Sequence, residues 1–479
     1  MSNAYEMVIG VEVHIELSTK TKIFCSCATT FGAKPNTQVC PVCMALPGSL
    51  PVLNKKVLEY ATAVGIATNC DISSTCRFDR KNYFYPDNPQ NYQISQLYVP
   101  LCKNGFIDID TKDGAKAIRI HEIHMEEDAG KLIHEENGKC SVVDFNRAGV
   151  PLIEVVSKPD MSNADEVIAF VESLRLIAQY LEVSDCKLQE GSMRVDVNLS
   201  VRKKGEEAMG TRTEMKNLNS FRAIKRAIEH ESKRQIELLE SGKNVLQETR
   251  RWDDNVGNSF SMRSKEEAKD YRYFPEPDLP KVCVSKELIM SIKAAQPEFA
   301  FTKAKRYKDE YGFSEEDIAI ITSTKQMAHF FESTVALSNK PREVANWIIG
   351  EMMRNLKDNS MEIEEIKLKP KQLAMLIELI EERKINRGIA KEVFEKAFVE
   401  EIDLENYIKS NNLLLVCDEE MLIKVIKEVI KNNPQSVEDY RAGKLKAKGY
   451  IVGQTMRMMK GTADPEIVNN KVEELLAAP

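Results

Sequence analysis

Apolar and polar residues alternate strictly along several segments of the first 290 residues. In MRVDVNLSVR, residues 193–202, every odd-numbered residue is apolar and every even-numbered residue is polar. The segment VEVHIEL, residues 11–17, repeats the pattern and places Glu12, His14 and Glu16 on one face. Because successive side chains of a strand point to opposite faces, this alternation predicts half-buried β-strands.

Two other segments of this front part carry apolar residues at helical spacing. One begins at a capping candidate, Ser162 or Asn163, and the other begins at Asn219–Ser220 and ends near Gly242. After residue 290 the pattern is helical almost throughout. The clearest helical segments there are 314–338, 341–356 and 370–383.

These patterns predict an α+β protein: an antiparallel-sheet domain followed by all-α parts. A break in the helical pattern near KSNNLLLVCDEE separates a small helical tail from the rest. We therefore expect a first domain at residues 1–293, a helical domain at 294–404 and a helical tail domain at 405–479. A chain of 479 residues is long enough for two to four domains with buried cores.

Charge and composition narrow the class of protein. The formal net charge is −7, so nucleic-acid binding would need a local basic patch. No apolar run approaches the roughly 20 residues of a membrane span, and the N-terminal segment lacks the pattern of a secretory signal. We therefore expect a cytoplasmic protein that makes no use of a membrane. The 11 cysteines, an odd number in such a chain, argue against a disulfide framework.

Four of the cysteines stand in a metal-binding pattern. Cys25 and Cys27 form a C-x-C pair, and Cys40 and Cys43 form a C-x-x-C pair twelve residues later. Two close pairs across a short loop, residues 25–43, can converge as four thiolates around a tetrahedral zinc ion. Such a site has no open position for water, so it would be structural. Redox cysteines or ordinary buried thiols are the alternatives.

The segment IHEIHMEEDAGK, residues 120–131, concentrates acidic residues. Glu126 and Glu127 stand side by side, and like charges repel unless a cation neutralises them. A solvated acidic turn is the plain alternative. The alternation of apolar and polar residues in this region also shifts by one position between Ile120 and Ile123, which predicts a β-bulge.

Other predicted strands carry carboxylates in similar positions. Glu154 stands in the apolar run PLIEVV, Asp196 lies on the polar face of 193–202, and GTRTEMK alternates basic residues with Glu214. Taken singly, each is consistent with a solvent-facing strand side. If the faces belong to one sheet, their carboxylates and one imidazole suit Mg²⁺ or Mn²⁺, and their Arg and Lys residues suit phosphate. That chemistry is phosphoryl transfer by a positioned cation.

Several common catalytic motifs are absent from the sequence. There is no G-x-x-x-x-G-K-[ST] loop and no G-x-G-x-x-G opening a helix, so a nucleotide would be held in another way. There is also no G-x-S-x-G elbow, so a serine hydrolase of that type has no support.

Two basic regions could contact phosphate. FDRKNYFYPDNPQNYQISQ, residues 78–96, places Arg80 and Lys81 beside tyrosines that could stack on a base, or it is a loop with structural aromatics. The tail is the best candidate for binding an RNA backbone, although a solvated helix face would look similar. Its basic residues include Lys444, Lys446, Lys448, Arg457 and Lys460.

Several longer motifs resemble those of the GatB family, one of the subunits of aspartyl/glutamyl-tRNA amidotransferase. They occur in the family's order and span nearly the whole chain. They are FDRKNYFYPD with YQISQ, IHMEEDAGK, DFNRAGVPLIEVVS, EGSMRVDVNLS, EMKNLNSF, DYRYFPEPDLP and GKLKAKGYIVGQTMRMMKGTADPEIVN.

The resemblance implies a reaction and a complex. ATP would phosphorylate the side-chain carboxylate of glutamyl-tRNA(Gln) or aspartyl-tRNA(Asn). Ammonia from a separate amidase subunit would then displace phosphate to give the amide, within a heterotrimer that also contains a small third subunit. The catalytic domain would have a fold similar to glutamine synthetase, and the tail would hold the tRNA.

The resemblance also implies the roles of particular residues. The catalytic cluster would be Glu12, His14, Glu126, Glu127, Glu154, Asp196 and Glu214. His14 and Glu127 would bind Mg²⁺ directly, and the nucleotide would be held by Arg80, Lys81, Arg194 and Lys216. Cys25, Cys27, Cys40 and Cys43 match the zinc-bearing branch of the family, in which zinc is structural.

Two other functions compete with this one. A non-catalytic RNA-binding factor would explain the cysteines and the basic tail but gives the acidic faces no role. An ATP-dependent amide ligase for a small free acid would use the same cation site and would not need the tail.

Overall fold

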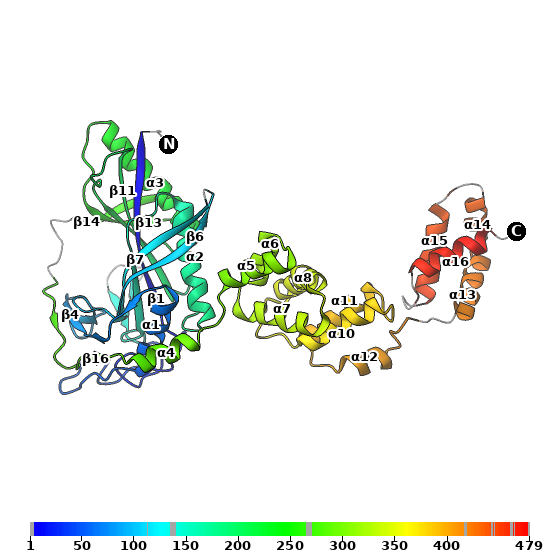
Figure 1. Ribbon diagram of the computed structural model, residues 1–479, viewed down its shortest axis with the longest axis horizontal. Helices are drawn as coiled ribbons and strands as arrows, with labels where there is room; N and C mark the ends of the chain where they lie inside the picture. Colours follow the sequence, from blue (N-terminus) through cyan, green and yellow to red (C-terminus); the bar gives the residue numbers. More distant parts are fainter. Residues whose placement is uncertain are drawn as a thin grey trace. The chain divides into compact units, whose positions relative to one another are not determined.

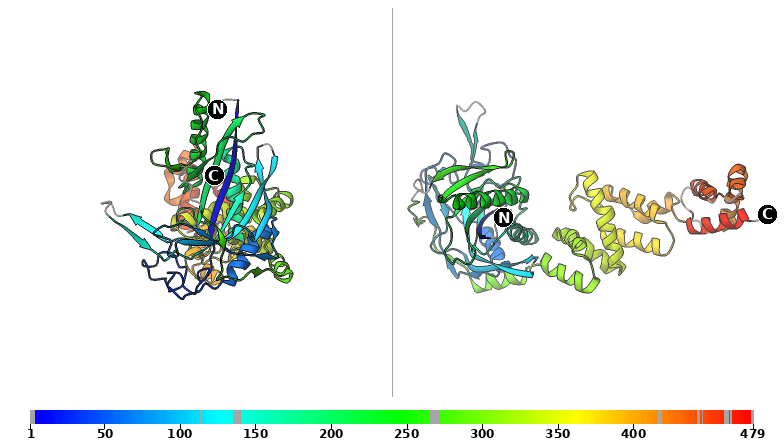
Figure 2. Two further views of the ribbon diagram at one scale, coloured as in Figure 1. Left: turned by 90° about the vertical axis from the view of Figure 1, so that its left-hand side faces the viewer. Right: turned by 90° about the horizontal axis from the view of Figure 1, so that it is seen from above.

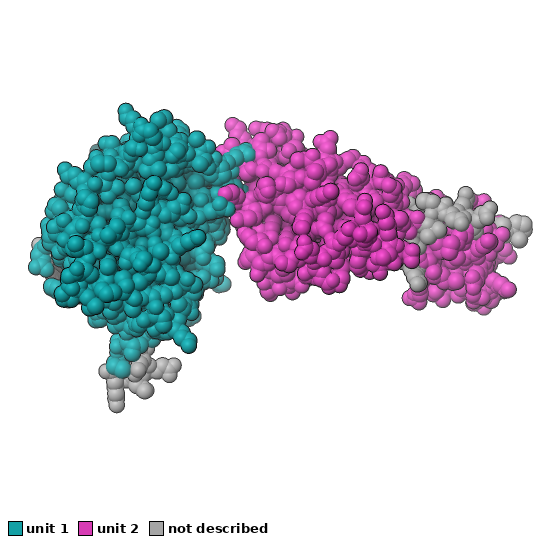
Figure 3. Space-filling view, turned by 90° about the horizontal axis from the view of Figure 1, so that it is seen from below, with its two compact units in different colours: residues 1–299 teal, residues 300–479 magenta. Residues whose placement is uncertain are grey.

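A computed structural model gives the architecture of the chain. It describes residues 4–112, 114–134, 140–264, 271–415, 419–441, 444, 446–459, 463 and 465–477. The chain divides into two compact units, residues 1–299 and residues 300–479 (Figure 3). The first unit is a large sheet with helices and the second is wholly helical over its described residues, so the chain is α+β as predicted. The domain boundaries expected at 293 and 404 stay predictions.

A nine-stranded sheet forms the centre of the first unit (Figure 1). Its strands stand in the order β14 (Asn258–Ser264), β13 (Glu248–Asp253), β12 (Thr213–Lys216), β11 (Met193–Lys203), β1 (Tyr5–Glu16), β10 (Pro151–Ser157), β7 (Gly114–Glu127), β6 (Cys102–Thr111) and β2 (Asp71–Ile72). The central strand β1 therefore lies between β10 and β11, which come from distant parts of the sequence.

The sheet is antiparallel apart from one pair of strands. β12 and β13 run parallel, which the sequence did not predict. They are joined through the long helix α3 (Phe221–Glu240), and such a crossover returns the chain in the same direction. The predicted bulge is confirmed: Ser157 pairs with Ile120 and Val156 with Glu122, so the pairing register shifts by one residue.

Helices cover the apolar face of this sheet. α1 (Lys55–Ala67), α2 (Ala164–Tyr180) and α3 contact its strands, and α2 also contacts α1 and α3 (Figure 1 and Figure 2). Asn163 caps α2 and Ser220 caps α3, as two of the predicted candidates. The odd-numbered residues of β1 from Ile9 to Ile15 are at most 1% exposed. The polar residues of β1 consequently share the opposite face.

Three small sheets complete the described part of the first unit. They pair β4 (Asp79–Asn82) with β5 (Tyr92–Ser95) and β15 (Phe274–Pro275), β3 (Thr75–Cys76) with β16 (Val282–Cys283), and β8 (Lys131–His134) with β9 (Ser141–Asp144). The segment FDRKNYFYPDNPQNYQISQ thus contains the antiparallel pair β4–β5 rather than only a loop. Helix α4 (Lys286–Ala294) lies near the end of the unit.

Over its described residues, the second unit contains two separate apolar cores. Trp347, Phe331, Phe394 and Phe398 lie in the first core. Its helices are α5 (Ala300–Tyr311), α6 (Glu315–Ile321), α7 (Lys325–Ser338), α8 (Pro341–Trp347), α9 (Met353–Asn359), α10 (Pro370–Glu381), α11 (Arg387–Val399) and α12 (Leu404–Ser410), with a π-helical turn at Ile348–Met352. The predicted segment 314–338 is thus two helices.

The tail core is smaller. Ile426, Ile451, Val468 and Val472 are fully buried in it. Its helices are α13 (Glu419–Asn432), α14 (Pro434–Arg441), α15 (Lys446–Met458) and α16 (Pro465–Ala477). Within the described parts of the chain, every helix is too short or too polar to cross a membrane.

Candidate active site

Neighbouring strands bring six of the seven predicted catalytic residues, all except Glu127, onto one face of the sheet. On β1, Glu12 stands opposite Asp196 of β11, and His14 stands opposite Glu154 of β10. The neighbouring strands β7 and β12 extend the same row, because Glu154 stands opposite His124 and Asn198 opposite Glu214. The face therefore collects side chains from five strands, and its possible cation ligands form two groups.

The first group contains His14, Glu126 and Glu154. Nε2 of His14 lies 3.5 Å from a carboxylate oxygen of Glu126 and 3.4 Å from one of Glu154. One potential ligand atom from each of the three residues lies within 4.8 Å of the others. One imidazole with two carboxylates offers the nitrogen and oxygen ligands that a hard divalent cation accepts.

His124 adjoins this group and was not among the predicted site residues. Its Nε2 lies 3.1 Å from Glu154, and its Nδ1 lies 3.5 Å from Glu122. Burial opposes its charged form, but Glu154, Glu122 and Glu126 outweigh it and raise the pKa of His124 to about 10. A protonated imidazole therefore neutralises Glu154. Pairing of the strands identifies His124, and the sequence pattern alone could not.

The second group contains Glu12, Asp196 and Glu214, again with one ligand atom each within 4.8 Å of the others. Burial, followed by Glu154, Glu214 and Asp196, raises the pKa of Glu12 above its ordinary value. Lys216 pairs with Asp196 and, at 2.9 Å, with Glu214. Three carboxylates around one ammonium leave excess negative charge, which a further cation would offset.

Glu127 lies outside both groups. Because successive strand residues point to opposite faces, it is directed away from Glu126. Its carboxylate accepts hydrogen bonds from the Ile94 backbone N–H at 2.9 Å and from the Gln90 amide at 3.2 Å. Burial raises its pKa to about 7. The structure therefore pairs His14 with Glu126 and not with Glu127, the ligand we had expected.

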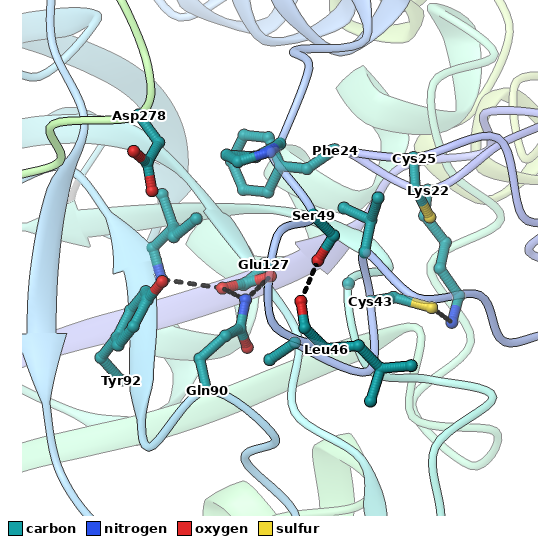
Figure 4. A pocket seen from close by; sticks show the side chains of 15 residues that line it. Lys22, Phe24, Cys25, Cys43, Leu46, Ser49, Gln90, Tyr92, Glu127 and Asp278 are labelled. Atoms are coloured by element: carbon teal, nitrogen blue, oxygen red, sulfur yellow. Dashed lines mark hydrogen bonds between the residues drawn. The ribbon is translucent and has the colours of Figure 1, made fainter.

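Glu127 instead lines a small hollow that it shares with the cysteine loop. The hollow has a volume of about 100 Å³, and Gln90, Tyr92, Lys22 and Cys43 also contribute to its wall (Figure 4). The only predicted catalytic residue on it is Glu127.

The four basic side chains predicted to bind the nucleotide lie in different surroundings. Lys81 lies close enough to Glu126 and Glu154 for both carboxylates to raise its pKa, against the effect of burial. Arg194 stands opposite His14 and pairs with Asp128, with Nη2 3.0 Å from Oδ2. Arg80 is held elsewhere, by Glu276 at 2.7 Å and Asp278 at 3.0 Å. Lys81, Arg194 and Lys216 therefore border the acidic groups, whereas Arg80 serves an ion-pair network.

A third polar group continues the row beyond His14. Burial and the neighbouring Asp128 raise the pKa of Glu16 to about 8, which makes it a hydrogen-bond donor to that carboxylate. Arg147 approaches Asp128 to 3.3 Å from the other side. The sequence placed Glu16 on the correct face and Asp128 beside Glu127, but only the folded sheet brings the two carboxyl groups together, with Arg147 and Arg194 paired to Asp128.

The four cysteines converge as predicted. The sulfur of Cys43 lies 4.0 Å from that of Cys27 and 3.9 Å from that of Cys40, and all four fit within 4.8 Å. Four sulfurs at the tetrahedral Zn–S distance of about 2.3 Å would be roughly 3.8 Å apart. Hydrogen bonding from Cys25 and, more weakly, the Lys22 ammonium lower the pKa of Cys43 to about 4, although burial opposes this. The cluster is compatible with a structural metal ion.

The basic residues of the tail are only partly available for RNA. Lys446 and Arg457 are exposed. Lys444 pairs with Asp439 at 3.0 Å, and Lys448 pairs with Glu473. Lys460 lies outside the described residues.

Two family models match this chain, one in its N-terminal part and one in its C-terminal part. The family model described as the GatB/GatE catalytic domain matches residues 7–290, and the model described as the GatB domain matches residues 329–476.

Curated relatives match over almost their whole length. A protein of Agathobacter rectalis is 61% identical over 98% of this chain and 99% of its own, and one of Lachnoclostridium phytofermentans is 58% identical over 99% of both chains. A protein of Lachnospira eligens is 57% identical over 98% of this chain and 99% of its own. All three are named as the B subunit of aspartyl/glutamyl-tRNA(Asn/Gln) amidotransferase.

Proposed function

The chain belongs to the GatB family, the B subunits of aspartyl/glutamyl-tRNA(Asn/Gln) amidotransferases, and from that premise we propose that it carries the synthetase half of the reaction. In this proposal ATP phosphorylates the side-chain carboxylate of Glu-tRNA(Gln) or Asp-tRNA(Asn). Ammonia then displaces phosphate and leaves the amide. The working enzyme is a cytoplasmic heterotrimer with an amidase subunit, which releases ammonia from glutamine, and a small third subunit.

The observation that carries the proposal is the pair of acidic groups on one face of the sheet. His14, Glu126 and Glu154 form one group, and Glu12, Asp196 and Glu214 form the other. Mg²⁺ held there would neutralise charge on the phosphates and polarise the transferred phosphoryl group. We propose Glu126 as the carboxylate that binds Mg²⁺ together with His14, since Glu127 is directed to Gln90.

The protein's own residues position the reactants. One hydrogen bond, from Nη1 to Oδ1, and one ion-pair contact, between Nη2 and Oδ2, hold Arg194 against Asp128, with its guanidinium on the strand position opposite His14. Lys81 presents an ammonium near Glu126 and Glu154 from outside the central sheet. Both cations can balance the negative charge that accumulates between γ-phosphate and carboxylate in the transition state.

The remaining predicted residues have supporting roles. Cys25, Cys27, Cys40 and Cys43 would hold a structural zinc ion that fixes the loop of residues 25–43. The exposed Lys446 and Arg457 would contact tRNA phosphates. Among the nucleotide-binding candidates, Arg80 would act indirectly, because Glu276 and Asp278 already hold it.

Release of ADP by the complex reconstituted with its amidase and small subunits tests the proposal. The reaction mixture contains ATP and Mg²⁺ with Glu-tRNA(Gln), Asp-tRNA(Asn), a correctly charged tRNA or free glutamate. The proposal requires ADP only with a misacylated tRNA, and the preferred one would identify the substrate. ADP with free glutamate would indicate a small-molecule amide ligase instead, and RNA binding without any ADP would indicate a non-catalytic factor.

A further inference from the structure

The cysteine loop, residues 25–43, is fastened to a turn that approaches the acidic face. This turn, residues 143–149, runs from the end of β9 toward the start of β10 and carries Arg147. Loop and turn are far apart in the sequence, so only the folded chain brings them together. The contacts that join them have no role in the function proposed above.

Asn36 makes the central connection. Its backbone N–H donates a hydrogen bond of 3.0 Å to Oδ1 of Asp144, and its side-chain amide donates one of 3.0 Å to the carbonyl of Val143. Its side-chain oxygen accepts a third, of 2.8 Å, from the Phe145 N–H. Asn36 has a left-handed backbone with φ +58°, which asparagine adopts more readily than most residues. One residue of the loop therefore holds three successive residues of the turn.

Asn146 makes the reciprocal connection from the turn. Its side-chain oxygen accepts a hydrogen bond of 2.8 Å from the Gln38 N–H, and its amide donates one of 2.7 Å to the Lys34 carbonyl. At the far end of the turn, the Ile23 N–H donates to the Gly149 carbonyl at 2.9 Å. The cysteine loop and the residues just before it therefore hold the turn along its length.

Lys22 connects the turn to the cysteines themselves. Its side chain is fully buried, and its ammonium donates to the Phe145 carbonyl at 3.2 Å and lies 3.5 Å from Sγ of Cys43 (Figure 4). Burying an ammonium is costly unless an anion accompanies it, and a metal-bound thiolate is such an anion. The position of the turn thus depends on the cysteine cluster by two routes.

The turn delivers Arg147 to Asp128. Its Nε lies 3.3 Å from Oδ2 of Asp128, and its guanidinium donates to the carbonyls of Ala129 and Gly130, each at 3.0 Å. Within the described part of the chain, Oδ2 of Asp128 is buried and makes no hydrogen bond. Its charge is offset by Arg147 and by Arg194, whose Nη2 lies at 3.0 Å. A buried carboxylate of this kind depends strongly on each of its cationic neighbours.

We propose that the cysteine loop positions the cations of the acidic face. By holding the turn it keeps Arg147 against Asp128, and Asp128 keeps Arg194 on the strand position opposite His14. Asn36 and Arg147 are positioning residues in this arrangement. The inference rests on the proposed function for the role of Arg194. It adds that the loop affects the rate of the reaction, although the cysteines belong to neither acidic group.

Releasing the turn without removing a metal ligand tests the proposal. Asn36→Gly keeps the left-handed backbone and loses the two side-chain hydrogen bonds. Asn339→Gly, at another left-handed asparagine with φ +55° after α7, is the matched control. In the reconstituted complex we expect Asn36→Gly to keep its zinc and to lower kcat for tRNA-dependent ADP release about 10-fold, with KM for ATP within about twofold. Asn339→Gly should match wild type, and wild-type kcat in Asn36→Gly would overturn the proposal.

Combined variants separate positioning from a general loss of stability. Arg147→Gln should lower kcat at least as far as Asn36→Gly does. Because both act through Arg147, adding Asn36→Gly or Cys40→Ser to Arg147→Gln should lower kcat by less than about twofold more. Losses that multiply in the combined variants would overturn the proposal, since the loop would then act independently of Arg147.

Hydrogen exchange of the full complex tests the physical link without the reaction. Cys40→Ser should speed exchange of the backbone amides of residues 143–149, including the Phe145 N–H, while β11 stays protected. Asn36→Gly should do the same with zinc still bound. Unchanged protection of the turn in both variants would overturn the link even if the wild-type complex releases ADP with misacylated tRNA. Faster exchange in a complex whose wild type lacks that activity would support the link and contradict the proposed function.

Discussion

His124 and Glu154 stand directly opposite each other on β7 and β10, with Nε2 of the imidazole 3.1 Å from Oε2 of the carboxylate. Glu154 also faces His14 at 3.4 Å, so one carboxylate serves two histidines. The pKa of Glu154 is accordingly held well below its ordinary value by His124 and His14, against the effect of burial. A cation bound beside His14 would have to share this carboxylate with a protonated His124.

The first prediction concerns the protonation of His124. Without Mg²⁺, its pKa should be near 10, and Glu154→Gln should move it toward the ordinary value of about 6.5. Because the folded pKa is the higher one, the stabilisation from the charged imidazole is complete below about pH 6.5 and is lost as the pH rises through 10. NMR titration of histidine-labelled protein, assigned with His124→Gln, measures this. A wild-type pKa below 7 would contradict the pairing.

The second prediction separates the two adjacent glutamates. Glu126→Gln should raise the Mg²⁺ concentration for half-maximal ADP release by about 10-fold or more, because it removes a carboxylate from the group around His14. Glu127→Gln is the matched control: it should leave the Mg²⁺ requirement within about twofold, since Gln90 and Ile94 hold that side chain elsewhere. A larger shift for Glu127→Gln than for Glu126→Gln would assign the cation to Glu127, as the sequence motif first suggested.

The third prediction concerns the four cysteines. Cys40→Ser or Cys43→Ser should reduce bound zinc from about one ion per chain to nearly none, because a closed tetrahedral site uses all four thiolates. Cys283→Ser, at an exposed position away from the cluster, should keep the metal. Elemental analysis of the purified protein measures the content. Zinc retained in both cluster variants would exclude this site.

The fourth prediction ranks the basic residues of the tail. Lys446 is exposed, whereas Lys448 is paired with Glu473 and is 18% exposed at its side chain. Lys446→Ala should weaken tRNA binding and reduce the slope of log K against log salt by about 1. Lys448→Ala should have the smaller effect. Binding curves at several salt concentrations test the order, and equal slopes in wild type and Lys446→Ala would remove Lys446 from the interface.

Local pattern predicted several central strands and two of the helices of the sheet domain. The alternation of 193–202 became β11, the capping candidates Asn163 and Ser220 start α2 and α3, and the phase change near Ile120 is the bulge opposite Val156. Each of these features depends on neighbours in the sequence, which explains the success.

Features that depend on residues far apart in the sequence could not be predicted from the local pattern. The parallel pairing of β12 with β13 and the opposition of His124 to Glu154 follow from strand order, which periodicity does not encode. The choice between Glu126 and Glu127 depends on which side chains of β7 share the sheet face of His14 and which point to the other face, where Gln90 and Ile94 hold Glu127. The sequence therefore predicted which acidic residues come together better than it predicted which of them lie beside His14.

The two acidic groups are joined by a single rigid strand. Glu12 and His14 are two residues apart on β1, which is paired on both sides, so their backbones are held at about 6.6–6.8 Å. Neither group can move relative to the other without shearing the sheet. If a cation bound at each group, one cation could therefore influence the other only electrostatically. The two positive charges would repel each other, and a triphosphate between them would relieve this repulsion. Cooperative loading would then depend on the nucleotide and on ionic strength, and a change of backbone conformation would not be needed.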